Sequence, residues 1–143
     1  MTIEVELVRE VTDEVVEAFG RLLPQLSTSA PQLDVGALTA IATWPGNSLL
    51  VARIEGVIVG ALTLVVFPIP SGTRARIEDV VVDTAARGKG VGAQLTEEAL
   101  VIARERGART VDLTSRPARE AANRLYERMG FARRDSRVYR KVP

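Results

Sequence analysis

Two apolar stretches limit what this chain can fold into more than any other feature. Residues 57–67 read VIVGALTLVVF and residues 80–82 read VVV, with almost no polar residue among the apolar ones. A half-exposed strand alternates apolar and polar residues, whereas a near-continuous apolar run is typical of a strand buried on both faces. The sequence therefore predicts a sheet whose two sides are both covered by helices.

The other elements follow from periodicity and from breaker residues. Helices are predicted at 12–26, 34–44, 91–106 and 119–130; Pro24 should end or kink the first of them, and Asp34 should cap the second. Strands are predicted at 3–10, on either side of a turn at Glu55 and Gly56, at 74–83 and at 110–114. A closing hairpin is predicted at 131–142. This is the order β-α-α-β-β-β-α-β-α-β-β in an α/β (α+β) protein, with about seven strands and four helices. A chain of 143 residues is expected to form one domain, residues 1–143.

Composition restricts the chemistry that is available. The chain has no cysteine and no histidine, which leaves carboxylates, Tyr, Ser, Thr, Lys, Arg and the backbone as reactive groups, and no metal is expected. No apolar run is long enough for a membrane span and the acidic start does not resemble a signal peptide, so we expect a cytoplasmic protein without a membrane partner. Aromatic residues make up only 4% of the chain, which gives little support for binding nucleic acid.

Charge is distributed unevenly along the chain. Residues 1–100 carry 7 basic and 13 acidic residues, whereas residues 101–143 carry 12 basic and 5 acidic ones. A basic final third favours an anionic ligand or partner, although single arginines usually solvate a surface.

A glycine-rich turn follows the second apolar stretch. The letters RGKGVG, residues 87–92, stand between a predicted strand and a predicted helix. Such a turn presents unpaired N–H groups at the positive end of a helix, an arrangement that binds phosphate, and Arg87 and Lys89 add positive charge. The phosphate loop G-x-x-x-x-G-K-[ST] is absent, and the dinucleotide fingerprint is not matched because Ala93 follows Gly92.

Two motifs resemble those of one known family. Arg87-x-x-Gly90-x-Gly92 directly follows a hydrophobic strand, and the letters AANRLYERMGF, residues 121–131, have the spacing N-x-x-Y-x-x-x-G-F. Both motifs and the order of elements resemble the GNAT superfamily of acyl-CoA-dependent N-acyltransferases over essentially the whole chain. The resemblance implies the GNAT fold, with a mixed and mostly antiparallel central sheet that splays between its fourth and fifth strands, and it is consistent with a homodimer.

The resemblance also implies a binding site for acetyl-CoA. The amides of Gly88, Lys89, Gly90, Val91 and Gly92 would hold the pyrophosphate, together with Arg87.

The pantetheine arm would lie along Val80, Val81 and Val82, pairing with the backbone of the first and third as an added strand would. Asn123 would contact the arm, and Tyr126 would point at the thioester sulfur and protonate the departing thiolate. Asn123 could instead be an ordinary surface residue, and Tyr126 an aromatic at the edge of the core.

A base for the acceptor amine must come from a carboxylate, acting directly or through water. In a regular strand Glu78 and Asp79 point to opposite faces, so at most one of them reaches the acceptor. We favour Glu78 as the base or as a ligand of the acceptor ammonium; the alternative is an ion pair with Arg74 or Arg76. The segment IEDVVVD resembles the corresponding strand of glucosamine-6-phosphate N-acetyltransferases, but one strand is too little to transfer their substrate.

The variable parts of the family, here residues 24–34 and 67–75, should form the acceptor pocket. Arg74 and Arg76 could recognise a carboxylate or a phosphate there. The resulting hypothesis is an N-acetyltransferase that moves the acetyl group of acetyl-CoA to a primary amine of a small molecule by direct attack in a ternary complex. The alternatives are a protein or peptide N-acetyltransferase and a non-catalytic CoA-binding module.

Overall fold

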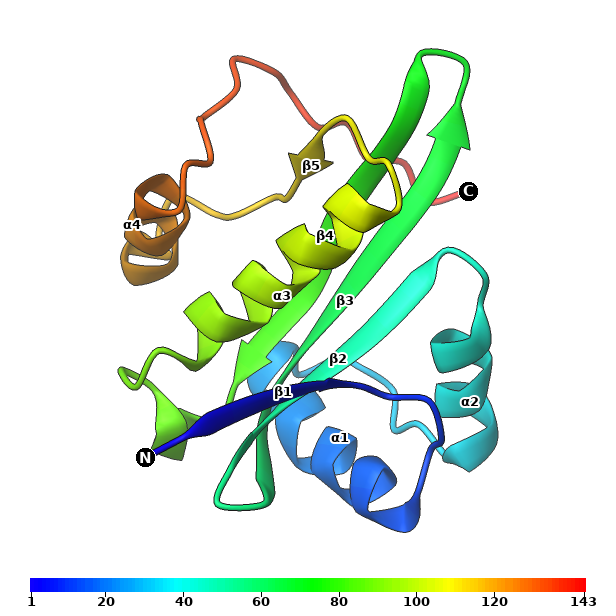
Figure 1. Cartoon of the computed structure of the whole chain (residues 1–143), viewed down its shortest axis with the longest axis vertical. Coiled ribbons are helices and arrows are strands. Elements are labelled where there is room, and N and C mark those ends of the chain that lie inside the picture. The colour runs from blue at the N-terminus through cyan, green and yellow to red at the C-terminus, as the bar shows by residue number, and fades with distance from the viewer.

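The computed structural model describes residues 1–143 (Figure 1). The strands are β1 (Ile3–Leu7), β2 (Asn47–Ile54), β3 (Val57–Ile69), β4 (Gly72–Val82) and β5 (Val111–Asp112), and the helices are α1 (Asp13–Leu26), α2 (Val35–Thr43), the short 3-10 helix η1 (Thr84–Ala86), α3 (Val91–Glu105) and α4 (Glu120–Arg128). No helix is long and apolar enough to cross a membrane.

The strands form one mixed sheet in the order β1-β2-β3-β4-β5, in which only β5 runs parallel to its neighbour. The turn between β2 and β3 has Glu55 at φ 50° and Gly56 at φ 81°. Two successive residues with positive φ are the mark of a type I′ hairpin, which matches the twist of the strands it joins. The predicted turn is therefore confirmed.

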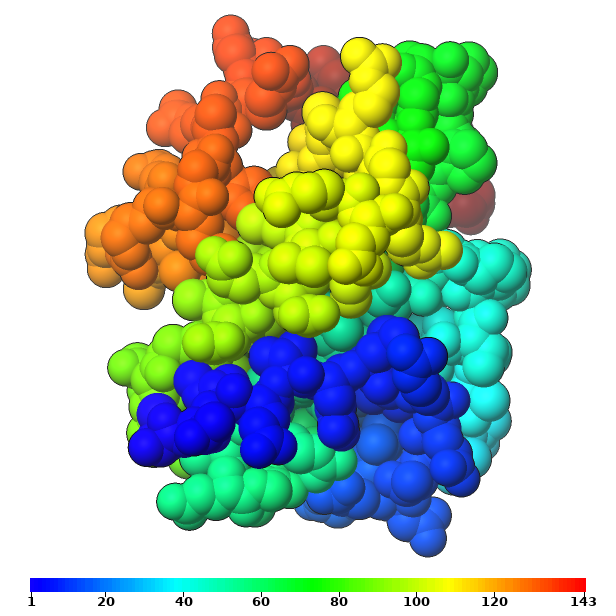
Figure 2. Space-filling view, in the orientation of Figure 1, coloured from blue at the N-terminus to red at the C-terminus, as the bar shows by residue number.

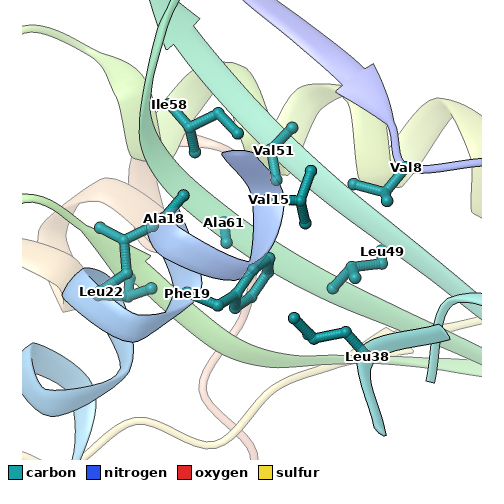
Figure 3. Close-up of a cluster of buried hydrophobic side chains, with 11 residues drawn as sticks. Val8, Val15, Ala18, Phe19, Leu22, Leu38, Leu49, Val51, Ile58 and Ala61 are labelled. Carbon is teal, nitrogen blue, oxygen red and sulfur yellow. The ribbon is translucent and has the colours of Figure 1, made fainter. Parts of the chain in front are cut away.

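Both faces of the sheet are buried, as the apolar runs predict. Alternate residues of β2 belong to different clusters: Leu49 and Val51 pack with α1 and α2, while Leu50 and Ala52 pack with α3. Figure 3 shows the first cluster, in which Phe19 of α1 and Leu38 of α2 point toward β2 and β3. The long strands β3 and β4 are thus held between two helical layers.

The helix ends have local causes. The Thr12 hydroxyl accepts a hydrogen bond from the Val15 amide at 3.3 Å, and the Asp34 carboxylate accepts one from the Ala37 amide at 2.8 Å. These are ordinary N-caps. Pro24 does not stop α1, which continues to Leu26, so the proline lies in its last turn.

The prediction of about seven strands is wrong, because the sheet has five. The expected closing hairpin at 131–142 contains no strand, and Val138 and Tyr139 are 74% and 87% exposed. These two apolar residues are adjacent and would point to opposite faces of a strand, so the segment has no apolar face to bury. Because β5 pairs at only two positions, it also offers little edge for a further strand to pair with. Figure 2 shows an opening between the orange segment after α4 and the yellow residues before β5.

Candidate active site

The glycine-rich turn presents free backbone donors at the start of α3. The first hydrogen bond of that helix runs from the Gln94 amide to the Gly90 carbonyl, and the amides of residues 88–93 donate to no backbone acceptor. Gly88 and Gly90 have φ values of 79° and 87°, and an added Cβ at either would meet nothing within 4 Å. The turn therefore fits an anionic group such as pyrophosphate, which could approach these amides closely.

The other residues of this turn have distinct positions. Arg87 folds back so that its Nε donates to the Val82 carbonyl at 3.3 Å, and Lys89 is exposed. The side chain of Val91 is buried, which leaves only its amide for a ligand. A Cβ on Gly92 would lie 3.5 Å from Leu125, so this glycine faces α4.

A contact between α1 and the start of η1, which precedes the glycine-rich turn, was not predicted. Gln25 accepts hydrogen bonds from the amide and hydroxyl of Thr84 at 2.9 and 2.8 Å, and Arg21 lies 3.5 Å from Asp83. Arg21 and Gln25 are four residues apart and so share one side of α1. The four-residue spacing of Arg21 and Gln25 was the only sign of this contact in the sequence, and it does not indicate which residues they contact.

One edge of β4 is open where the pantetheine arm is expected. β5 pairs only with Ala75 and Arg76, so residues 77–82 have no strand on that side. Val80 and Val82 are half-buried against the α3 cluster, whereas Val81 is buried in the cluster of α1 and α2. α4 lies beyond this open edge, beside the N-terminal part of α3 (Figure 1).

A β-bulge in β4 changes where the two carboxylates point. Thr63 pairs with Glu78 and Ala61 pairs with Val81, so Asp79 and Val80 both oppose Leu62. Asp79 has φ 51°, in the left-handed region. The extra residue interrupts the alternation of side chains. The expectation that Glu78 and Asp79 point to opposite faces is therefore wrong, because both line the same cavity.

This cavity has a volume of about 130 Å³ and lies between the sheet and the first two helices. Its walls are mostly apolar, with Phe19, Leu38 and Ile41 from the helices and Leu33 from the predicted acceptor segment 24–34. Glu78 is half-exposed and lies 3.6 Å from Arg76, a weak surface ion pair. The cavity is an apolar pocket that carries two acids.

Tyr126 is the buried residue of α4, at 9% exposure, and its ring meets Phe131 edge to face at 5.8 Å. The helical spacing of residues 119–130 predicts a buried stripe of Ala118, Ala122, Leu125 and Met129 on the side of the helix opposite Tyr126. This prediction is wrong in part, because Ala118 precedes α4 and is exposed, and Tyr126 itself faces the protein interior. Burial raises the pKa of the Tyr126 phenol above its usual value, and the positive charge of Arg119 offsets part of that rise. The phenol is therefore protonated at neutral pH.

Two polar groups lie near the start of α4. The amide nitrogen of Asn123 donates to the Arg116 carbonyl at 3.0 Å, so this side chain holds the preceding loop and has its oxygen left for a ligand. In the same loop, the buried hydroxyl of Ser115 has no hydrogen-bond partner. Nothing in the sequence around Ser115 indicated a buried hydroxyl.

Comparisons with known proteins identify the family of this chain. The model of the acetyltransferase (GNAT) family matches residues 11–131. A glucosamine 6-phosphate N-acetyltransferase of Trypanosoma brucei brucei is 36% identical over 112 residues, which are 73% of this chain and 74% of that protein.

Two solved structures are similar over the whole chain. A transcriptional regulator from Bacillus halodurans C-125 has 31% identity and a TM-score of 0.80, with 99% of each chain covered. An acetyltransferase of Trypanosoma brucei has 28% identity and a TM-score of 0.80, with 99% of this chain and 100% of that chain covered. With its helix-capping glycine turn, its open β4 edge and a family match across most of its length, the chain belongs to the GNAT family of acetyltransferases.

Proposed function

We propose that this acetyltransferase moves the acetyl group of acetyl-CoA to a primary amine of a small molecule, by direct attack within a ternary complex. The observation that carries the proposal is the bulge in β4, which brings Glu78 and Asp79 together in one small, mostly apolar cavity. An ammonium group would be attracted to these acids and could lose its proton to one of them. The 36%-identical relative is named for an amino sugar phosphate, which supports a small amine as acceptor.

The donor would bind along β4 and the start of α3. Free amides of residues 88–92 would hold the pyrophosphate, and the open edge at Val80 and Val82 would accept the pantetheine arm as an additional strand does. Asn123 would offer its side-chain oxygen to the arm. Acetyl-CoA is the cosubstrate of the family, and these residues fit it.

The acceptor must lose a proton before it attacks. An alkylammonium has a pKa near 10.4, so the free amine costs about 4 to 5 kcal/mol at pH 7. Glu78 would take that proton, directly or through water, and Asp79 would hold the ammonium beside it. The Val80 amide could polarise the thioester carbonyl, and the Tyr126 phenol would protonate the thiolate as it leaves.

A cavity of about 130 Å³ with apolar walls suits a small amine better than a basic peptide, which needs an open acidic groove. A non-catalytic module would bind CoA without using the two acids. These alternatives differ in what they turn over, so they can be separated by experiment.

We expect acetyl-CoA to raise the melting temperature of the protein and amines to cause release of free thiol. At a ligand concentration 100 times the Kd, stabilisation is about 2.7 kcal/mol. Thermal shift with acetyl-CoA and with CoA, followed by a thiol-release screen over small amines and basic peptides, measures both. Stabilisation without turnover of any acceptor would identify a binding module, and turnover of peptides alone would replace the small amine.

Replacing Gly90 with valine should weaken binding of acetyl-CoA by about tenfold or more, because Cβ and its branches would occupy the space that the pyrophosphate needs. Valine is also strained at φ 87°, so some stability will be lost. Gly107→Val is the matched control: it has φ 80°, open space around its Cβ, and a position at the other end of α3. Calorimetric titration with acetyl-CoA should separate the two variants, and Lys89→Ala should lose less affinity than Gly90→Val. Equal affinities of both valine variants would place the phosphate site elsewhere.

A further inference from the structure

A second cavity, with a volume of about 400 Å³, lies where β3 and β4 extend beyond the helices and β5 begins. Its lining includes Phe67, Arg74, Arg76, Thr110, Asp112 and Arg134. We propose that this cavity is an anion subsite that receives a phosphate or carboxylate group of the acceptor amine. The inference rests on the proposed function, since it names a property of the acceptor.

The charges of the lining are not balanced by the protein. Three guanidinium groups face this cavity with one carboxylate, Asp112. Arg74 donates to the hydroxyls of Thr110 and Ser71 at 3.3 and 3.1 Å and has no carboxylate within ion-pair distance. The positive charge of Arg74 is therefore held in place by neutral groups, which leaves it available for an anion.

Arg53 shows what a structural arginine looks like in this protein. Its guanidinium contacts two carboxylates, Glu6 at 2.9 Å and Glu14 at 2.7 Å. These contacts raise the pKa of Arg53 and lower that of Glu14. The arginines of the second cavity differ in their carboxylate contacts, because Arg76 has only the one with Glu78 at 3.6 Å and Arg74 has none. Arg76 otherwise donates to the neutral hydroxyl of Thr114 at 3.0 Å.

The second cavity is placed correctly for one molecule to reach both sites. Arg74, Arg76 and Glu78 are alternate residues of β4, so they lie on the same face of the sheet. Two residues of a strand span roughly 7 Å. An acceptor with its ammonium at Glu78 and Asp79 and its anionic group at Arg76 or Arg74 would therefore carry the two groups roughly 7 Å or more apart. An anion on Arg76 would also draw that side chain away from Glu78.

The third arginine comes from the basic end of the chain. Arg134 follows α4 and reaches the second cavity from a segment that forms no strand. Its neighbour Arg133 is exposed and is not part of the lining. The excess of positive charge in residues 101–143 thus contributes one side chain to this cavity, and the adjacent arginine provides a matched control.

The test compares acceptors that differ only in their anionic group. With acetyl-CoA saturating, thiol release is measured for glucosamine and glucosamine 6-phosphate, and for 6-aminohexanoate and its methylamide. We expect kcat/KM to be at least tenfold higher for the anionic member of one pair, and the pair identifies phosphate or carboxylate as the group bound. Arg74→Ala should reduce that preference by about 10- to 100-fold, mainly through KM, because a charge-assisted hydrogen bond is lost.

Arg134→Ala should reduce the preference in the same direction and, as a change in an exposed residue, should not affect folding. Arg133→Ala should leave the preference unchanged. Equal kcat/KM within both pairs, or equal effects of Arg134→Ala and Arg133→Ala, would overturn the anion subsite while the transferase function stands.

If no amine is acetylated, the proposed function fails and the subsite is judged by binding alone. Inorganic phosphate is then titrated calorimetrically into CoA-saturated protein, in which the glycine turn is already occupied. Weaker phosphate binding by Arg74→Ala and Arg134→Ala than by Arg133→Ala supports the subsite, and identical binding by all of them overturns it.

Discussion

Replacing Glu78 with glutamine is expected to lower kcat by about 10²- to 10⁴-fold, with acetyl-CoA affinity nearly unchanged. Glutamine keeps the size of the side chain and its hydrogen bonding but cannot take a proton from the acceptor ammonium, and a positioned base commonly contributes this much. The ion pair with Arg76 is lost as well, but a half-exposed pair at 3.6 Å contributes little to stability. Steady-state kinetics with the identified acceptor and calorimetric titration with acetyl-CoA measure the two quantities.

Asp79→Asn is the matched control, because the bulge places Asp79 in the same cavity one residue away. Asparagine tolerates positive φ well, so the bulge should survive this change. We expect a smaller loss, expressed mainly as a higher KM for the acceptor. A loss below threefold in Glu78→Gln together with a large loss in Asp79→Asn would transfer the role of base to Asp79. Small losses in both variants would mean that the proton of the acceptor ammonium is removed through a water molecule.

Features with a local cause could be predicted from the sequence. Asp34 caps α2 and the turn at Glu55 and Gly56 forms the expected hairpin, because each depends on residues that are close in the chain. The burial of β3 on both faces was also predictable, since an apolar run needs cover on two sides. The glycine turn belongs to the same class, as its conformation is set by Gly88 and Gly90 themselves.

Features that depend on distant partners were missed. The bulge at Asp79 depends on how β4 pairs with β3 across a hairpin, and nothing in IEDVVVD marks the extra residue. Gln25 and Thr84 are 59 residues apart, so their contact cannot be inferred from either segment. The expected closing strands needed an edge to pair with, and β5 pairs at only two positions.

The sequence indicated candidate site residues but not how they are arranged. The sequence patterns indicated Glu78, Gly90, Asn123 and Tyr126 as candidates. Strict alternation predicted Glu78 and Asp79 on opposite faces of β4, and the predicted helical stripe placed Tyr126 on the side facing away from the interior. The first error came from applying an ideal period to an irregular strand. The second came from taking the buried stripe of α4 too narrowly, because Tyr126 lies one turn from both Ala122 and Met129, which are half-buried. One extra residue in β4 was enough to change which side chains face the first cavity.

Replacing Tyr126 with phenylalanine should lower kcat by about ten- to a thousand-fold, with little change in acetyl-CoA affinity. Phenylalanine keeps the buried ring and its edge-to-face contact with Phe131 and removes only the proton donor. We expect a loss near the lower limit, because a thiol of pKa about 8.5 already leaves readily as an anion. Tyr139→Phe is the matched control, since Tyr139 is 87% exposed in the C-terminal segment.

The raised pKa of Tyr126 adds a second readout for the same variant. The folded protein holds this proton more tightly than the unfolded chain, so the contribution to stability is present below pH 10 or so and is lost as pH rises through the folded-state pKa. Melting temperature should therefore fall less between pH 9 and pH 11 in Tyr126→Phe than in the parent protein or in Tyr139→Phe. Unchanged kcat in Tyr126→Phe would mean that the thiolate leaves without help from this phenol. A large loss of melting temperature at pH 7 would mean that the hydroxyl stabilises the fold instead, because removing a donor used only in catalysis leaves the packing of the ring intact.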